Sequence, residues 1–343
     1  MFSVSLKDIE MVLHDFGIFK KVSSYIELQC YNYENENQEL KYIRLICKVI
    51  FTDNSAVVAR FRNEADVSLG LAEAQGSFAE LLRLNGISCP LQYKTDGLFA
   101  KWYTINGYKV IVTVEEFMAG ELEYVDMEIA GKTGRLLARA HNISEKHGFH
   151  VRNKVLFNPF KENDLFSFRH FNTMSNGLPE REQIVFHKIV KKYNDYMEIL
   201  SPLKSGPCYA VQGDISNCNM YQLQNGCLGI FDFNRCGDNN LYCDAVMQAV
   251  FESRLMDYPV NYTEKDKDIL LSVFLEGYQS ERPFNNTQKE MFPYLYAVIN
   301  AFWSVDIIWD DKSLLKEYNR KNYDAVHKWL EEIWKRLSVP DAI

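Results

Sequence analysis

The sequence lacks an apolar run long enough to cross a membrane, and its first residues carry acids where a secretory signal has a basic start. Its eight cysteines include no C-x-x-C pair, which excludes a zinc ribbon and a thioredoxin motif. Basic side chains are in the minority, with 38 Lys and Arg against 46 Asp and Glu, so a nucleic-acid backbone is disfavoured as a partner. We therefore expect a cytoplasmic protein with reduced cysteines and with neither a membrane nor a nucleic-acid partner.

The N-terminal part has the pattern of a small sheet. Four segments are rich in β-branched and aromatic residues and are separated by polar turns, at 42–51, 55–61, 98–103 and 109–114. Residues 69–85 instead carry apolar residues at helical spacing, and Gly86 and Pro90 follow them. This pattern predicts an antiparallel sheet with one helix.

The rest of the chain is predominantly helical in pattern. Helical periodicity covers 121–147, 178–201 and the region from about 242 onwards, and a short β-like island lies at 208–233, with a two-residue turn expected at Asn225-Gly226. With 343 residues the chain is long enough for two domains. We predict an α+β, bilobal fold with a small antiparallel-sheet lobe over residues 1–117 and a larger, mainly helical lobe over 118–343.

One stretch of the β-like island has the residue types needed for phosphoryl transfer. Asn219 follows Asp214 by five residues, the interval found in the catalytic loop of kinases, and Asp232 follows an apolar strand further on. Phosphoryl transfer requires one carboxylate beside the acceptor hydroxyl and separate oxygen ligands for Mg²⁺. Asp214 fits the first role, and Asn219 and Asp232 fit the second.

Here the chain resembles the aminoglycoside phosphotransferase and choline kinase superfamily. The matching positions are Gly213, Asp214 and Asn219, then Phe231, Asp232 and Phe233, then Gly237, Asp238 and Asp244. The resemblance implies a protein-kinase-like fold, ATP (with GTP as an alternative) and Mg²⁺ as cofactors, and transfer to a hydroxyl of a small molecule by a monomer or homodimer. It also implies an interlobe hinge at Val114–Gly120, with Glu116 and Met118 as nucleotide contacts.

A cation that anchors the phosphates is expected on the strand at 55–61. Alternation places Val58, Arg60 and Arg62 on one face, and Arg60 follows the apolar run as the kinase lysine does. On the helix at 69–85, Gln75 falls about 40 degrees from Leu71, beside the apolar stripe. We therefore expect Gln75, rather than a glutamate of this helix, to be the partner of Arg60 and a second nucleotide-site residue.

Several departures from the family pattern leave a second interpretation open. The family's His before Gly-Asp is Gln212, the glycine of kinase D-F-G is Asn234, and residues 18–69 contain no glycine for a phosphate-covering loop. Such a cover would lie at 32–37, which carries acids. These features are also compatible with a catalytically weak or inactive protein that binds a nucleotide or metabolite.

The remaining acids and the acceptor are less informative. The sequence argues against a protein kinase, because the eleven residues between Asp232 and Asp244 are too few for an activation loop. Asp244 is expected to cap the following helix, Asp238 to be structural, and His141 to orient the loop by a hydrogen bond. The sequence does not identify the phosphate acceptor.

Overall fold

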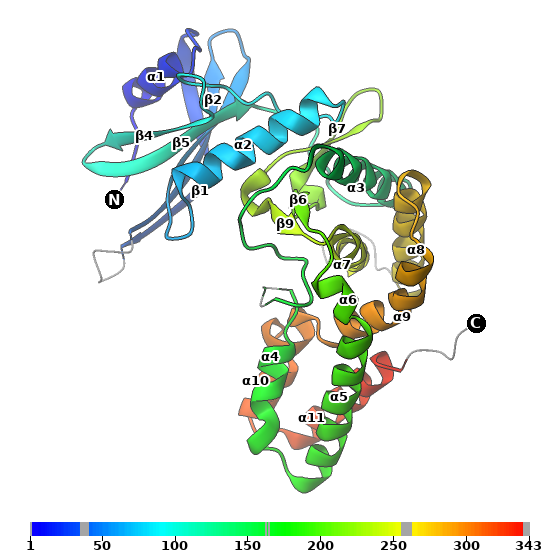
Figure 1. The fold of residues 1–343 in the computed structure, drawn as a ribbon. Helices are drawn as coiled ribbons and strands as arrows, with labels where there is room; N and C mark the ends of the chain where they lie inside the picture. The colour runs from blue at the N-terminus through cyan, green and yellow to red at the C-terminus, as the bar shows by residue number, and fades with distance from the viewer. Residues whose placement is uncertain (1, 35–40, 162, 164, 255–262, 339–343) are drawn as a thin grey trace. The chain divides into compact units, whose positions relative to one another are not determined.

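The computed structural model describes residues 2–34, 41–161, 163, 165–254 and 263–338 (Figure 1). The chain forms two compact units. The first comprises Met1–Leu122, Val151–Asn153 and Asn217–Asn234, and the second comprises Glu123–His150, Lys154–Ser216 and Arg235–Ile343. The segment at 35–40, which includes half of the expected phosphate cover at 32–37, lies outside the described residues.

The first unit is built on an antiparallel sheet of five strands in the order β1-β2-β3-β5-β4. The strands are β1 (Val22–Glu34), β2 (Lys41–Phe51), β3 (Ala56–Asn63), β4 (Ala100–Ile105) and β5 (Tyr108–Glu116). The four strands expected from the sequence are confirmed. β1 was not expected, because the region that forms it is richer in polar residues than the other strands.

One face of this sheet packs on a helix that the sequence pattern did not predict, α1 (Leu6–Asp15). Ile9, Val12 and Leu13 of α1 are fully buried in one core cluster with residues such as Phe61 and Val112 of the sheet. A capping box between Ser5 and Asp8 begins the helix. The prediction of a single helix in this region is therefore wrong, because ten residues give few helical repeats to recognise.

The other sheet face carries α2 (Leu69–Leu84), as expected from its periodicity. Ala72 of α2 packs with Ala100 of β4 and Ile111 of β5 in a second, smaller cluster. The remaining part of this face carries the alternate residues of β2 and β3, among them Val58 and Arg60, and forms a cavity instead of a filled core.

A short hairpin also belongs to the first unit, formed by β7 (Met220–Gln222) and β8 (Leu228–Ile230). The amide of Leu223 donates to the carbonyl of Cys227, and Gly226 has φ +80°. The loop therefore has three residues and a left-handed glycine at its end, instead of the expected two-residue turn. The hairpin places Asn219 and Asp232, just outside its two strands, at the same end.

The second unit is mainly helical, as predicted. Its helices are α3 (Met127–His147), α4 (Phe168–Asn172), α5 (Glu180–Ile199), α6 (Ser201–Lys204), α7 (Leu241–Arg254), α8 (Glu264–Glu281), α9 (Asn286–Ala301), α10 (Leu314–Asn319) and α11 (Tyr323–Arg336). Two strands, β6 (Tyr209–Val211) and β9 (Gly237–Asn239), pair antiparallel. Among the described residues no helix is both long and apolar enough to span a membrane.

Candidate active site

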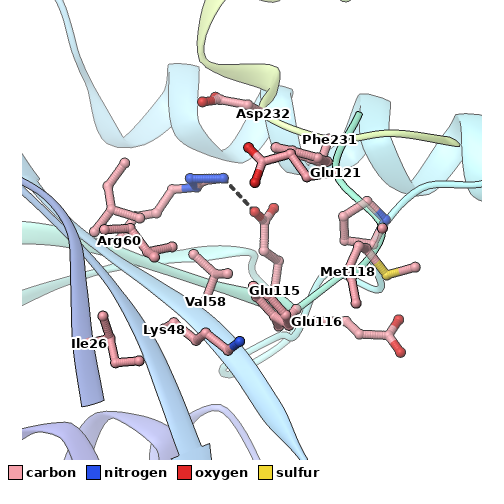
Figure 2. A pocket seen from close by; sticks show the side chains of 16 residues that line it. Ile26, Lys48, Val58, Arg60, Glu115, Glu116, Met118, Glu121, Phe231 and Asp232 are labelled. Atoms are coloured by element: carbon pink, nitrogen blue, oxygen red, sulfur yellow. Dashed lines mark hydrogen bonds and ion pairs between the residues drawn. The ribbon is translucent and has the colours of Figure 1, made fainter. Parts of the chain in front are cut away.

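A cavity of about 630 Å³ lies within the first unit, and Figure 2 shows the side chains around it. This volume is within the range of small-molecule sites in proteins. Four residues selected from the sequence line it: Arg60, Glu116, Met118 and Asp232. They come from β3, from the end of β5 and the segment after it, and from the end of the β7–β8 hairpin. The fold thus brings together residues separated by more than 170 positions in the sequence.

The Arg60 guanidinium donates to the Glu115 carboxylate at 2.5 Å (Figure 2). The expectation that Gln75 is the partner of Arg60 is therefore wrong. The reason is strand register: Arg60 lies opposite Thr113, so Glu115, two residues further along β5, projects from the same face beside it. This ion pair lies entirely within the sheet, whereas the kinase lysine pairs with a glutamate from a helix.

Both members of this ion pair are buried, Arg60 being 8% and Glu115 7% exposed. Burial alone would lower the pKa of Arg60, but the charges of Glu115 and then Asp232 raise it above its usual value. Gln92 donates a further hydrogen bond to Glu115 at 2.9 Å. Arg60 thus remains a fixed cation at the cavity wall, within electrostatic reach of Asp232.

Lys48 of β2 is a cavity residue that sequence reasoning missed. Its amino group lies 3.6 Å from the ring centroid of Phe117, a cation–π contact within the same cavity. Lys48 pairs across the strands with Val58, and its neighbour Ile46 pairs with Arg60. The available signal was one lysine within the otherwise apolar run at 45–51, and its place in the cavity depended on the strand register.

Gln75 lies elsewhere than expected. It is buried on α2, as its place on the helical wheel predicts, but its side-chain amide donates to the backbone carbonyl of Asn234 at 2.9 Å. Together with Arg62 it lines a small polar hollow of about 30 Å³. A direct role of Gln75 in nucleotide binding stays a prediction.

The two predicted metal ligands belong to the same unit. The backbone carbonyl of Asn219 accepts a hydrogen bond from the amide of Phe231 at 3.0 Å, which places Asn219 next to the residue before Asp232. Among the described residues no three His, Cys, Asp or Glu side chains converge as a self-sufficient metal site. One carboxylate and one amide oxygen nevertheless fit Mg²⁺, which in phosphotransferases takes the rest of its shell from phosphates and water.

Asp232 has an unusual backbone conformation, with φ +55°. A non-glycine residue in this region is disfavoured, and such strain is concentrated at functional sites. One carboxylate oxygen accepts a hydrogen bond from the amide of Asn234 at 3.2 Å, which closes a local turn. Asn234, which stands where kinases have the glycine, does not have a positive φ angle. This position therefore does not need the conformational freedom of glycine.

Asp214 lies in the second unit, in the loop after β6. Gly213 before it has φ +84°, and a Cβ there would lie 2.4 Å from the carbonyl oxygen of Arg235, so only glycine fits. The side-chain oxygen of Gln212 accepts from the Asp214 amide at 2.7 Å, and Gln248 of α7 binds both backbone groups of Ile215. Gln212 thus supports the loop by a hydrogen bond and needs no titratable group.

His141 and Asp244 form a buried network in the second unit. The Nε2 atom of His141 lies 3.1 Å from Asp244 Oδ2, and Asn239 donates to the other oxygen at 2.9 Å. Asp244 lies inside the first turn of α7, so the expectation that it caps this helix is wrong. The capping role belongs to Asn240, whose side-chain oxygen accepts from the amides of Tyr242 and Cys243.

The fold is that of small-molecule kinases. An aminopropanol kinase associated with a microcompartment matches 97% of this chain and 95% of its own, with a TM-score of 0.59 and 14% identity. An amicoumacin kinase solved in complex with AMP-PNP, Ca²⁺ and Ami matches 97% of this chain and 96% of its own, with a TM-score of 0.58 and 14% identity. A spectinomycin phosphotransferase solved with ADP and spectinomycin matches 98% of both chains, with a TM-score of 0.51 and 11% identity.

These likenesses confirm the expected fold class and, at the level of fold, the resemblance noted in the sequence. No family sequence profile matches the chain, and no curated protein sequence matches it. The similarity is thus carried by the arrangement of the elements over nearly the whole chain. At such low identity it does not identify a substrate.

Proposed function

We propose that this protein is a Mg²⁺-dependent small-molecule kinase that transfers the γ-phosphate of ATP, or of GTP, to a hydroxyl group of a small metabolite or antibiotic. The observation that carries the proposal is the cavity of the first unit, where Arg60, the segment Glu116–Met118 and Asp232 line one space of about 630 Å³. A kinase requires these three features around its nucleotide: a cation that anchors the phosphates, a backbone segment beside the nucleobase, and a metal ligand.

Each residue has a distinct proposed role. Arg60 binds the phosphates of the nucleotide, and the segment with Glu116 and Met118 borders the base. Asn219 and Asp232 hold Mg²⁺, which when bound neutralises charge on the phosphate oxygens. Asp214 accepts a hydrogen bond from the acceptor hydroxyl and receives its proton late in the transfer.

The boundary between a nucleotide-binding lobe and a helical lobe is proposed at residues 117 and 118, within this hinge segment. We further propose that the enzyme acts in the cytoplasm, on a small-molecule acceptor, as a monomer or homodimer.

The proposal is tested by calorimetry and thermal unfolding with ATP and GTP in the presence of Mg²⁺. We expect one of them to bind and to raise the melting temperature, because a ligand that binds only the folded state stabilises it. Asp232→Ala should abolish the Mg²⁺-dependent part of this binding, whereas Asp195→Ala, an exposed acid on α5, should leave it unchanged. Absence of binding of both nucleotides at millimolar concentration would overturn the proposal.

A second candidate, a nucleotide-binding protein without turnover, is favoured by Gln212, which cannot exchange a proton. The hydrogen bond from Asp214 to Gln212 weighs against it, because the loop is supported without a histidine. Nucleotide consumption across a panel of hydroxylated metabolites and antibiotics separates the two. Binding without consumption for any member favours the second candidate, and stimulated consumption by one member establishes the kinase.

A further inference from the structure

Asn234, two residues after Asp232, receives hydrogen bonds from three separate segments of the first unit. The guanidinium of Arg62, on β3, donates to its side-chain oxygen. Gln75, on α2, donates to its backbone carbonyl at 2.9 Å, and Asn153 donates to the same carbonyl at 3.4 Å. The chain that follows Asp232 is therefore fixed to β3, to α2 and to the segment Val151–Asn153.

The side chain of Phe233, which lies between Asp232 and Asn234 in the sequence, also attaches this segment to α2. Phe233 is buried and meets Phe78 of α2 edge to face, with ring centroids 6.1 Å apart. Asp232 thus precedes two consecutive anchored residues. The left-handed backbone of Asp232 costs free energy relative to the extended and right-handed regions, so these anchors help to hold the residue in that conformation.

Arg62 is suited to hold Asn234 in one orientation. It is only 3% exposed, and a buried guanidinium requires partners for its charge and its donors. Burial, followed by the positive charge of the neighbouring Arg60, lowers the pKa of Arg62 to about 10, while Glu64 and Asp232 oppose this shift. The side-chain oxygen of Asn234 is the acceptor that directs this cation toward the Asp232 segment.

We propose that Asn234, held by Arg62, is a positioning residue that keeps the Asp232 carboxylate in its metal-binding conformation. This inference rests on the proposed function, because it takes Asp232 as a ligand of a divalent cation. On this proposal the asparagine side chain has a function of its own at the position where kinases have glycine. Side chains that orient a metal ligand typically contribute about 10- to 100-fold to metal affinity.

The test measures Mn²⁺ binding directly, by the loss of the free Mn²⁺ signal in electron paramagnetic resonance, with and without AMP-PNP. For Asn234→Ala we expect the dissociation constant of Mn²⁺ in the AMP-PNP complex to rise about 10- to 100-fold. Metal-free AMP-PNP binding, measured by calorimetry, should change little. Asn234→Asp, which keeps an acceptor for Arg62, should bind Mn²⁺ at least as tightly as the wild type.

Asn194→Ala, an exposed asparagine on α5 and outside the cavity lining, serves as the control of the same substitution type. Unchanged Mn²⁺ affinity in Asn234→Ala would overturn the positioning role. A combined loss of Mn²⁺ affinity, metal-free nucleotide affinity and thermal stability would also overturn it, since this result would indicate general unfolding of the first unit. A wild-type protein that binds no AMP-PNP would instead refute the proposed function, so the two failures are distinguishable.

Discussion

The buried ion pair between Arg60 and Glu115 allows folding and nucleotide binding to be separated by substitution. Arg60→Met removes the cation and leaves the Glu115 carboxylate buried at the cavity wall. The double variant Arg60→Met/Glu115→Leu removes both charges and fills the space with apolar side chains. We expect the single variant to be destabilised and the double variant to regain stability, while both lose nucleotide affinity.

The magnitude follows from the burial of the pair. Removing one member of a buried ion pair costs about 3–5 kcal/mol, whereas replacing both members by apolar residues of similar volume is about neutral or stabilising. Gln92, which donates to Glu115 at 2.9 Å, remains available as a partner in the single variant, so we expect the lower end of this range, about 3 kcal/mol. That free energy corresponds to a roughly 100-fold larger population of the locally opened sheet, and hence to faster amide exchange.

Hydrogen–deuterium exchange of peptides from β3 and β5 measures this opening locally, and calorimetry with ATP and Mg²⁺ measures binding. Faster exchange in Arg60→Met, restored in the double variant, is the expected result. A double variant as destabilised as the single one would contradict the coupling between Arg60 and Glu115. A double variant that binds ATP as tightly as the wild type would refute the role of Arg60 as the phosphate anchor.

Three other predictions concern the loop, the helix packing and a buried acid. Asp214→Asn should lower kcat by about 100-fold or more with little change in nucleotide affinity, and a rate within a few-fold of wild type would remove Asp214 from the mechanism. Gly134→Ala should destabilise the protein in urea unfolding, because its Cβ would lie 2.0 Å from the Phe274 carbonyl oxygen of α8, whereas Gly70→Ala, with open space around it, should be neutral or stabilising. Burial raises the pKa of Glu252 to about 8, so the folded state retains a proton that the unfolded state loses above about pH 4.5, and stability should fall as pH rises from 4.5 to 8. Urea unfolding at several pH values should show this fall in the free energy of unfolding in the wild type and a smaller fall in Glu252→Gln. An equal dependence of the unfolding free energy on pH in the two proteins would contradict the prediction.

The sequence alone was sufficient to predict the strands β2 to β5 and the helix α2. The spacing of Asp214, Asn219 and Asp232 was sufficient to indicate a kinase-like motif. These features depend on residues close together in the chain: alternation of period two, helical periodicity and short motif intervals. The alternation in β3 also placed Val58, Arg60 and Arg62 on one face correctly, since they line the large cavity and the small hollow described above.

The partner of each side chain was decided by the tertiary structure. Glu115 meets Arg60 because of the register between β3 and β5, and Lys48 joins the same cavity because of the register between β2 and β3. Register aligns whole strands and is not encoded in any one of them, so a helical wheel for Gln75 could identify its buried face but not its partner. Asn234 has its role for the same reason: the donors that bind it come from segments up to 172 residues away, which only the folded chain brings to the residue after Phe233.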